Sequence, residues 1–337
     1  MIDGCPAGLE IAEEEINEEL GLRRPGTTPF VSARKEEDKA EILSGVFEGK
    51  TTGAPLSIIL FNKDAQSSTY EPLKDILRPG HAHFTYLEKY GVFDYRGGGR
   101  ASARETACRV AAGAVARKFL KVYQIEVCAY VKQIGDISAE AIPATELREK
   151  TRQSPLFCPD HAAGALMMQK LQEVQAEGDS LGGIVEAVVF SLPIGLGDPV
   201  YEKLEANLAC ALLSLPASKG VEIGAGFKAA TMKGSLHNDS FTQGPDGTVM
   251  TKTNHAGGTL GGISTGMPLV VRVAFKPASS IAKPQETLTV EGKPCTLSMP
   301  HTSRHDPCVA IRASVVVEAM CALVIADALL LNRCAKL

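Results

Sequence analysis

The sequence predicts an α/β fold of the α+β type, in which helices pack against antiparallel sheets within one unit. Segments with strand and helix periodicity alternate along all 337 residues. Several predicted strands follow one another directly, which favours antiparallel pairing. No repeat of about 20–50 residues is present, which excludes a solenoid. Because a chain of this length can bury one large core, we expect a single intertwined domain over 1–337.

Strand predictions rest on alternating or continuous apolar residues bounded by turn residues. At 1–6 we expect only the end of a strand, which runs into a turn. The other predicted strands, in chain order, cover 42–47, 56–61, 125–134, 182–192, 220–227 and 268–275. The glycine-flanked segment 49–53 predicts a hairpin turn. Residues 62–75 and 238–262 are polar, the second also rich in glycine, and predict long loops of the kind that often bind ligands.

Helix predictions rest on apolar residues at spacings of three and four. They cover 11–20, a helix that starts after Ser102, a helix capped by Asp160, and then 202–215 and 311–331. The last of these is apolar almost all round, so we expect it to be buried between layers or at an interface. The mixed charge run at 34–38 is typical of a solvated face.

Composition narrows the function classes. Hydrophobic residues make up 45% and charged residues 22% of the chain, as in ordinary soluble domains. A net charge of −4 argues against a general nucleic-acid binder. Nine cysteines without a C-x-x-C pair favour free thiols in a reducing cytoplasm, so we expect no disulfide framework. No apolar run is judged long enough to cross a membrane, and no signal peptide is expected.

The stretch from Arg78 to Leu120 carries the strongest functional signal. Its glycine run at 97–99 frees the backbone, and Ser102 with Glu105 has the spacing of a capping box. The arginines around this turn recur every four residues: Arg96, Arg100 and Arg104. A helix start beside cations suits an anion, most simply a phosphate. The alternative is a solvated basic turn ahead of a core helix.

Four further residues suggest acid–base or anion chemistry. His81 and His83 would share a face if they lie on a strand. No third ligand is visible beside them, so a proton donor is favoured over a metal site. Lys276 ends a strand and is followed by two serines, which predicts a second phosphate grip or a plain turn. Asp306 precedes Pro307, and predicts either a helix cap or a carboxylate held near a cation or a ring nitrogen.

Ordered motifs along nearly the whole chain resemble those of the chorismate synthase family. They are R-R-P-G at 23–26, S-G-V-F-E-G-K-T-T-G at 44–53, R-P-G-H-A-H at 78–83, G-G-G-R-A-S-A-R-E-T-A at 97–107, K-G-V-E-I-G-A-G-F at 219–227, N-H-A-G-G-T-L-G-G-I-S at 254–264, F-K-P-A-S-S at 275–280 and R-H-D-P at 304–307. Together these blocks are highly specific.

The resemblance implies a β-α-β sandwich, with helices between antiparallel sheets, that assembles as a homotetramer. It implies the conversion of 5-enolpyruvylshikimate 3-phosphate into chorismate and phosphate, the last step of the shikimate pathway. The family uses reduced FMN (FMNH2), and NADPH is a candidate reductant. The expected partner is thus a small phosphorylated metabolite in the cytoplasm, with no nucleic acid, membrane or metal involved.

The resemblance also assigns roles to residues. His81 would give a proton to the reduced flavin, Asp306 near flavin N5 would help remove the substrate proton, and Arg104 would assist. Substrate anions would be held by Arg23, Arg104 and Arg312. FMN would be held by Arg100, Ala101, Ser102, Pro216, Ala217, Gly261, Lys276, Pro277, Ala278, Ser279, Ser280 and Arg304.

The sequence departs from the family pattern at its start. The first strand and the G-E-S-H-G turn of the family are absent, Pro29 stands where a basic residue is common, and Ala101 replaces a frequent serine. One alternative is therefore a non-catalytic FMN-binding or assembly protein. Another is an enzyme of a phosphorylated metabolite that uses no flavin, because only the resemblance names FMN.

Overall fold

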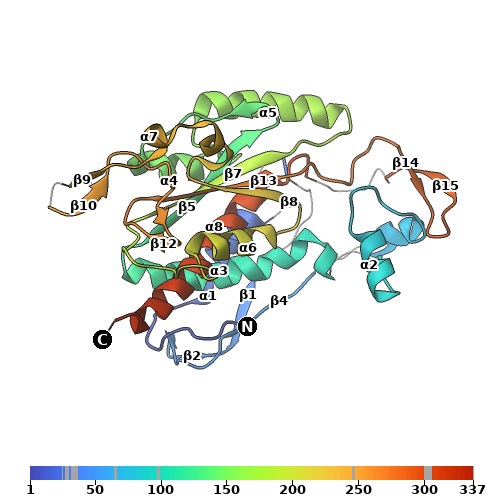
Figure 1. Ribbon diagram of the computed structural model, residues 1–337. Coiled ribbons are helices and arrows are strands. Elements are labelled where there is room, and N and C mark those ends of the chain that lie inside the picture. The colour runs from blue at the N-terminus through green and yellow to red at the C-terminus, as the bar shows by residue number, and fades with distance from the viewer. Residues whose placement is uncertain are drawn as a thin grey trace.

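The chain folds as a layered α+β structure around one five-stranded antiparallel sheet (Figure 1). The computed structural model describes residues 1–24, 26, 30–31, 37–63, 67–96, 99–244, 247–299 and 306–336. From top to bottom in Figure 1, helices α4 and α5 cover one face of the sheet, and α1, α3, α6 and α8 cover the other. Strands β1 and β4 lie below these helices, so the helices are enclosed between two β layers and the predicted sandwich is confirmed.

The α-helices are α1 (Glu13–Arg23), α2 (His83–Tyr90), α3 (Thr106–Val122), α4 (Ala144–Gln153), α5 (His161–Ala176), α6 (Leu204–Leu213), α7 (Gly234–His237) and α8 (Ala310–Leu331). The 3-10 turns are η1 (Ser67–Leu73), η2 (Gly99–Ala101), η3 (Ala103–Glu105), η4 (Gly226–Thr231) and η5 (Asn332–Cys334). The strands are β1 (Ala40–Ser44), β2 (Val46–Phe47), β3 (Lys50–Thr51), β4 (Ser57–Leu60), β5 (Glu126–Ile134), β6 (Ile137–Ser138), β7 (Gly183–Phe190), β8 (Ser218–Ile223), β9 (Phe241–Gln243), β10 (Val249–Thr251), β11 (Thr259–Leu260), β12 (Ile263–Ser264), β13 (Leu269–Phe275), β14 (Gln285–Leu288) and β15 (Pro294–Leu297).

The large sheet has the strand order β6-β5-β7-β13-β8. Its central strands pair antiparallel, with Val273 opposite Val185 and Val271 opposite Ala187. These four side chains are buried on the same face because alternate residues of a strand point the same way. The strands predicted at 125–134, 182–192 and 268–275 are confirmed.

Helix α8 is the centre of the helical layer, as its apolar composition predicts. It packs on α3, α6, β5 and β7. Gly113 of α3 lies against Ala319 of α8 so closely that an added Cβ would sit 2.3 Å from the Ala319 Cβ. Within the described residues, the segment Ala310–Cys334 has the length and composition to cross a membrane, so the expectation that no apolar run does was wrong. Its most apolar window is 61% buried, as in a core helix.

The smaller β layer is built by the predicted hairpin. β1 pairs antiparallel with β4, and the short pair β2–β3 is nested between them. Ile2 bridges to Leu56, so the chain start adds a further pairing to this layer.

A lobe made of η1, α2 and the β14–β15 hairpin lies at the right of Figure 1. Its two parts are joined where Leu77 N donates to Leu288 O at 2.9 Å and Ile76 bridges to Thr289. His81 and His83 do not lie on a strand, because His83 begins α2. The loops predicted at 62–75 and 238–262 are corrected in part, since the first contains η1 and the second contains the β9–β10 hairpin.

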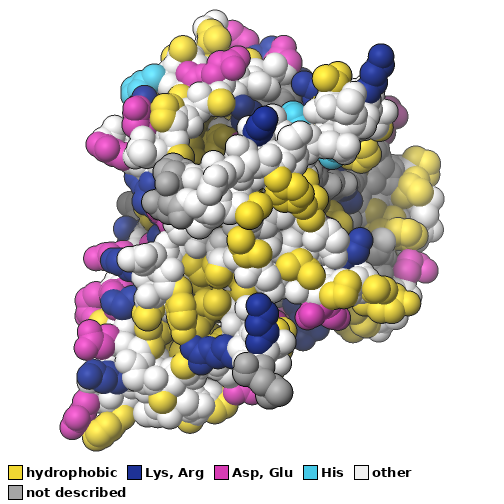
Figure 2. All heavy atoms as spheres, turned by 60° about the vertical axis from the view of Figure 1, so that its left-hand side comes forward, with side chains coloured by type: hydrophobic (Ala, Val, Ile, Leu, Met, Phe, Trp, Pro, Cys, Tyr) yellow, Lys and Arg dark blue, Asp and Glu magenta, His cyan; other side chains and the backbone are white. Residues whose placement is uncertain are grey.

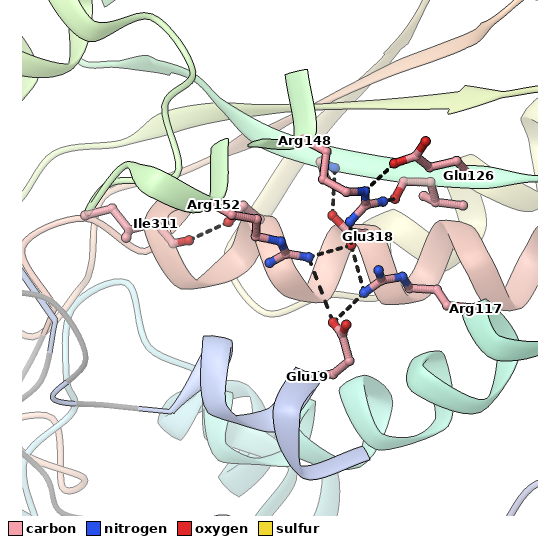
Figure 3. Close-up of polar contacts among 10 residues, drawn as sticks. Glu19, Arg117, Glu126, Arg148, Arg152, Ile311 and Glu318 are labelled. Atoms are coloured by element: carbon pink, nitrogen blue, oxygen red, sulfur yellow. Dashed lines mark hydrogen bonds and ion pairs between the residues drawn. The ribbon is translucent and has the colours of Figure 1, made fainter. Parts of the chain in front are cut away.

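A buried charge network ties α8 to the rest of the fold (Figure 3). Glu318 is 2% exposed and accepts hydrogen bonds from Ala129 N at 2.9 Å and Arg152 Nη2 at 2.8 Å. Two more guanidinium groups lie close to it, Arg117 at 3.0 Å and Arg148 at 3.5 Å. Helices α3, α4 and α8 and strand β5 are thus held together by one carboxylate.

Candidate functional site

Three arginines and two aspartates gather where α1 ends and where α3 and α8 begin. Arg104 Nη1 lies 2.6 Å from Asp38 Oδ1, and Arg23 Nη1 lies 3.3 Å from Asp38 Oδ2. Arg312 Nε pairs with Asp306 Oδ2 at 3.1 Å. The structure therefore brings together Arg23, Arg104, Arg312 and Asp306, the residues predicted to bind the substrate and accept its proton. Among the described residues, this arginine cluster holds three cations and two carboxylates.

Arg23 is the innermost member of the arginine cluster. It is 2% exposed, and its guanidinium donates to Thr106 Oγ1 at 3.0 Å and to Ala103 O at 2.7 Å. Burial lowers the pKa of Arg23 to about 10, and the charge of Arg312 adds to that effect. The side chains of Arg104 and Arg312 are 13% and 16% exposed, so a ligand reaches these two before it reaches Arg23.

Asp306 pairs with a cation and does not cap the last helix. α8 has no side-chain hydrogen bond at its N-cap, Val309. The segment carrying Asp306 is fixed by the sheet, because Leu181 N donates to Pro307 O at 2.8 Å. The interpretation of Asp306 as a carboxylate held near a cation is therefore confirmed.

The turn after β13 places a cation and hydroxyl groups beside the histidine segment. Lys276 Nζ donates to Gly80 O at 2.6 Å, and Lys276 N donates to Ala217 O at 3.0 Å. A Cβ at Gly80 would lie 3.2 Å from Ser279 Cβ, so the two segments nearly touch. Burial, and after it the charge of Lys219, lowers the pKa of Lys276. The local potential is thus positive, which suits a phosphate.

His81 sits beside this turn and contacts an arginine that the sequence analysis left without a role. Arg78 Nη2 lies 2.9 Å from Nε2 and 3.1 Å from Nδ1 of His81. A guanidinium can only donate, so the ring nitrogen that takes this hydrogen bond is the acceptor. Phe93 packs edge-on against His81, with ring centroids 6.2 Å apart.

Two consecutive residues connect the Lys276 turn to the segment that carries Asp306. Ser180 Oγ donates to Ala278 O at 2.8 Å, and Leu181 pairs with the segment that follows Asp306. In Figure 1 this region is the right-hand end of the sandwich, where β13 leaves the sheet and α3 begins.

The glycine turn ahead of α3 differs in detail from its prediction. Ser102 accepts from Arg104 N at 3.2 Å and caps η3, whereas the Glu105 carboxylate binds Arg109 at 3.0 Å, so no capping box forms. Arg96 pairs with exposed Asp94 at 2.9 Å and stands outside the arginine cluster. Arg100 and Ala101 lie in η2, directly before Ser102.

Other predicted flavin-binding residues fall into three groups. Pro216 and Ala217 precede β8 and meet the Lys276 turn through Ala217 O. Gly261 lies in the β11–β12 turn at the opposite, left-hand side of Figure 1, so one chain does not bring it to this site. Arg304 lies outside the described residues.

Two features of the site escaped sequence reasoning. Asp38 ends a mixed charge run that predicted a solvated face, yet it is 3% exposed, so that prediction is wrong for Asp38. His83 is buried and stacks on Phe93 at 4.5 Å. Among the residues that the structure describes, no group of three His, Cys, Asp or Glu side chains could hold a metal ion.

Comparisons with known proteins identify the family. The chorismate synthase family matches residues 1–330. The chorismate synthase of Protochlamydia amoebophila is 56% identical over 345 residues, covering 100% of this chain and 93% of the relative. That of Opitutus terrae is 50% identical over 328 residues, covering 97% and 90%. A solved structure described as a crystal structure of chorismate synthase has a TM-score of 0.76 and 35% identity, covering 98% of this chain and 86% of that one. The chain therefore belongs to the chorismate synthase family.

Proposed function

We propose that the chain converts 5-enolpyruvylshikimate 3-phosphate into chorismate and phosphate by eliminating the phosphate and one proton, with reduced FMN bound. The observation that carries this is the arginine cluster, in which Asp306 pairs with Arg312 and is connected through Leu181 and Ser180 to the turn that carries Lys276. Relatives that share half or more of this sequence bear the name of that enzyme. The comparisons lend no support to a non-catalytic alternative.

The leaving phosphate gains negative charge as its bond to carbon breaks. Arg104 and Arg312 are the arginines that it can reach, and preorganised guanidinium groups stabilise such charge in place of water. Arg23 stands behind them and raises the positive potential without offering its own surface. Asp306 is 12% exposed at its side chain, so it can accept the proton that leaves the substrate while Arg312 holds it in place.

The residues of the Lys276 turn fit an anionic cofactor. Lys276 offers a cation, Ser279 and Ser280 offer hydroxyl groups, and the nearby Lys219 adds positive potential. These groups would hold the phosphate of FMN, with Ala217 close by. Reduced FMN supplies electron density to the substrate when bound. His81 lies in the adjacent segment, where Lys276 Nζ donates to Gly80 O, and is the proton donor that we assign to the flavin.

An anaerobic assay tests this function. The chain with reduced FMN and the phosphorylated substrate should form chorismate, followed by its absorbance, and should release phosphate in equal amount. His81→Gln should lower kcat by about 100-fold, in the range typical for loss of an acid–base group. His161→Gln, at an exposed position at the start of α5, is the matched control and should change nothing. Phosphate release that does not depend on FMN would favour the flavin-free alternative.

We also propose that the enzyme works in the cytoplasm as a homotetramer and that NADPH is a candidate reductant. All nine cysteines are free, which agrees with a reducing compartment. The face with β9, β10 and β12, turned forward in Figure 2, shows hydrophobic side chains among charged ones. Large exposed side chains at this end include Tyr201, Phe227, Leu236, Phe241 and Leu260. Gly261 lies here too, so its contribution to a flavin site requires a second copy of the chain.

A further inference from the structure

Among the contacts between described residues, Asp38 is the only carboxylate that pairs with two arginines of the arginine cluster. Its Oδ1 faces Arg104 at 2.6 Å and its Oδ2 faces Arg23 at 3.3 Å. The side chain of Asp38 is 0% exposed, so no ligand can touch it. Whatever Asp38 does for a ligand, it does through the arginines.

The backbone at Asp38 has an unusual conformation. Its φ is 45°, in the left-handed region that non-glycine residues rarely adopt and that aspartate and asparagine tolerate best. Two residues later, Ala40 pairs with Leu60 at the start of β1. Asp38 therefore connects the edge of the smaller β layer to the end of α1 and to the turn ahead of α3.

We infer that Asp38 is a positioning residue, which aims Arg104 at the leaving phosphate and neutralises part of the charge of the arginine cluster; this rests on the proposed function. Arg104 has a second anchor in Phe61 O, at 3.3 Å from Nη2. A guanidinium held at these two points has a fixed orientation. The negative charge of Asp38 also lowers the positive potential of the arginine cluster, which limits how tightly the cluster retains the phosphate product.

Asp38→Asn separates this role from simple structural support. Asparagine has the same size and tolerates the left-handed backbone, so the variant should fold, whereas alanine would strain it. Without the carboxylate charge the site should bind anions more tightly but aim them less well. In calorimetry without FMN, we expect the Kd of inorganic phosphate to fall by about threefold or more. We expect kcat to fall about tenfold or more while KM stays the same or falls.

Two further variants locate the effect. Arg104→Gln should abolish most of the heat of phosphate binding, which would place the binding at this arginine. Asp94→Asn removes a carboxylate from an exposed pair with Arg96 and should match the unaltered chain in both assays. Circular dichroism and gel filtration of each variant confirm that it is folded.

The results separate the two proposals. Folded Asp38→Asn protein with unchanged phosphate affinity, or with affinity and kcat lost together, overturns the positioning role. An unaltered chain that binds phosphate but forms no chorismate overturns the proposed function instead, and the calorimetric comparison still decides the role of Asp38.

Discussion

Replacing Glu318 by glutamine should destabilise the chain strongly, although it removes only a charge. Glu318 is the shared ion-pair partner of Arg117, Arg148 and Arg152 (Figure 3). Glutamine fills the same space but leaves these guanidinium groups facing a neutral amide in the interior. Glu19 remains as a partner of Arg117 and, at 3.9 Å, of Arg152, so part of the charge stays compensated.

The size of the effect follows from the burial of the network. Removing one partner of a buried charge pair costs about 3–5 kcal/mol of unfolding free energy. With an unfolding entropy of about 2.1 cal/mol/K per residue, 337 residues give about 0.7 kcal/mol/K. We therefore expect Tm to fall by about 4–7 °C at pH 7. Glu149→Gln, at an exposed position on the neighbouring helix α4, is the control and should shift Tm by less than about 1 °C.

The pH dependence gives a second, independent check. Burial raises the pKa of Glu318, but the three arginines outweigh it and the pKa ends below its usual 4.5. Because the folded pKa is the lower one, the stabilisation is complete above 4.5 and is lost as the pH falls through the folded value. Scanning fluorimetry of both proteins should therefore show a Tm gap at pH 7 that narrows below pH 4. A gap under about 2 °C, or one that is the same at both pH values, would refute the reasoning.

Three other changes have definite expected outcomes. Gly113→Ala should prevent normal folding, seen as loss of soluble protein or a large fall in Tm, because the new Cβ would lie 2.3 Å from Ala319 Cβ; Gly234→Ala, with nothing within 4 Å, should be neutral. Asp160→Ala should cost about 1 kcal/mol, or about 1–2 °C in Tm, because Asp160 caps α5 through Ala162 N and Ala163 N. An unchanged Tm would contradict this. Lys276→Ala should weaken FMN binding about tenfold or more in a flavin fluorescence titration, and equal affinity would place the cofactor phosphate elsewhere.

Elements with a strong local pattern were predicted well. The helix capped by Asp160 is α5, and its buried stripe includes Met167 and Leu171, as the spacing indicates. The strands of the large sheet and the apolar helix α8 were found for the same reason, since their burial repeats along the chain. Local patterns are sufficient where one face of an element meets a continuous core.

Elements held by long-range contacts were missed. Helix α4 buries only Leu147 and Thr151 and is anchored by arginines that reach Glu318, far away in sequence. The alternating histidines at 81 and 83 suggested a strand, but Gly80, at φ 69°, turns the chain into α2. Tertiary contacts decided these segments, and no window of sequence contains them.

The candidate site shows the same division. Residue types identified Arg104 and Asp306, because cations and a carboxylate near helix starts suit anion chemistry, whereas Arg312 came only from the family resemblance. Asp38 was assigned to the surface, because a run of mixed charges is usually exposed and nothing local shows that its last member turns inward. Arg78 gained a role only from its contact with His81.

The crossing of Gly113 and Ala319 has a consequence for the evolution and engineering of this chain. α3 begins just after Arg104, and α8 begins just after Asp306 and carries Arg312 in its first turn. Since the backbone of α3 at Gly113 packs directly on Ala319 of α8, the interior fixes the spacing of the groups that we propose to bind phosphate and take the proton. Selection for turnover would thus constrain two small residues that no substrate ever meets, and redesign of the reaction would have to begin at that crossing.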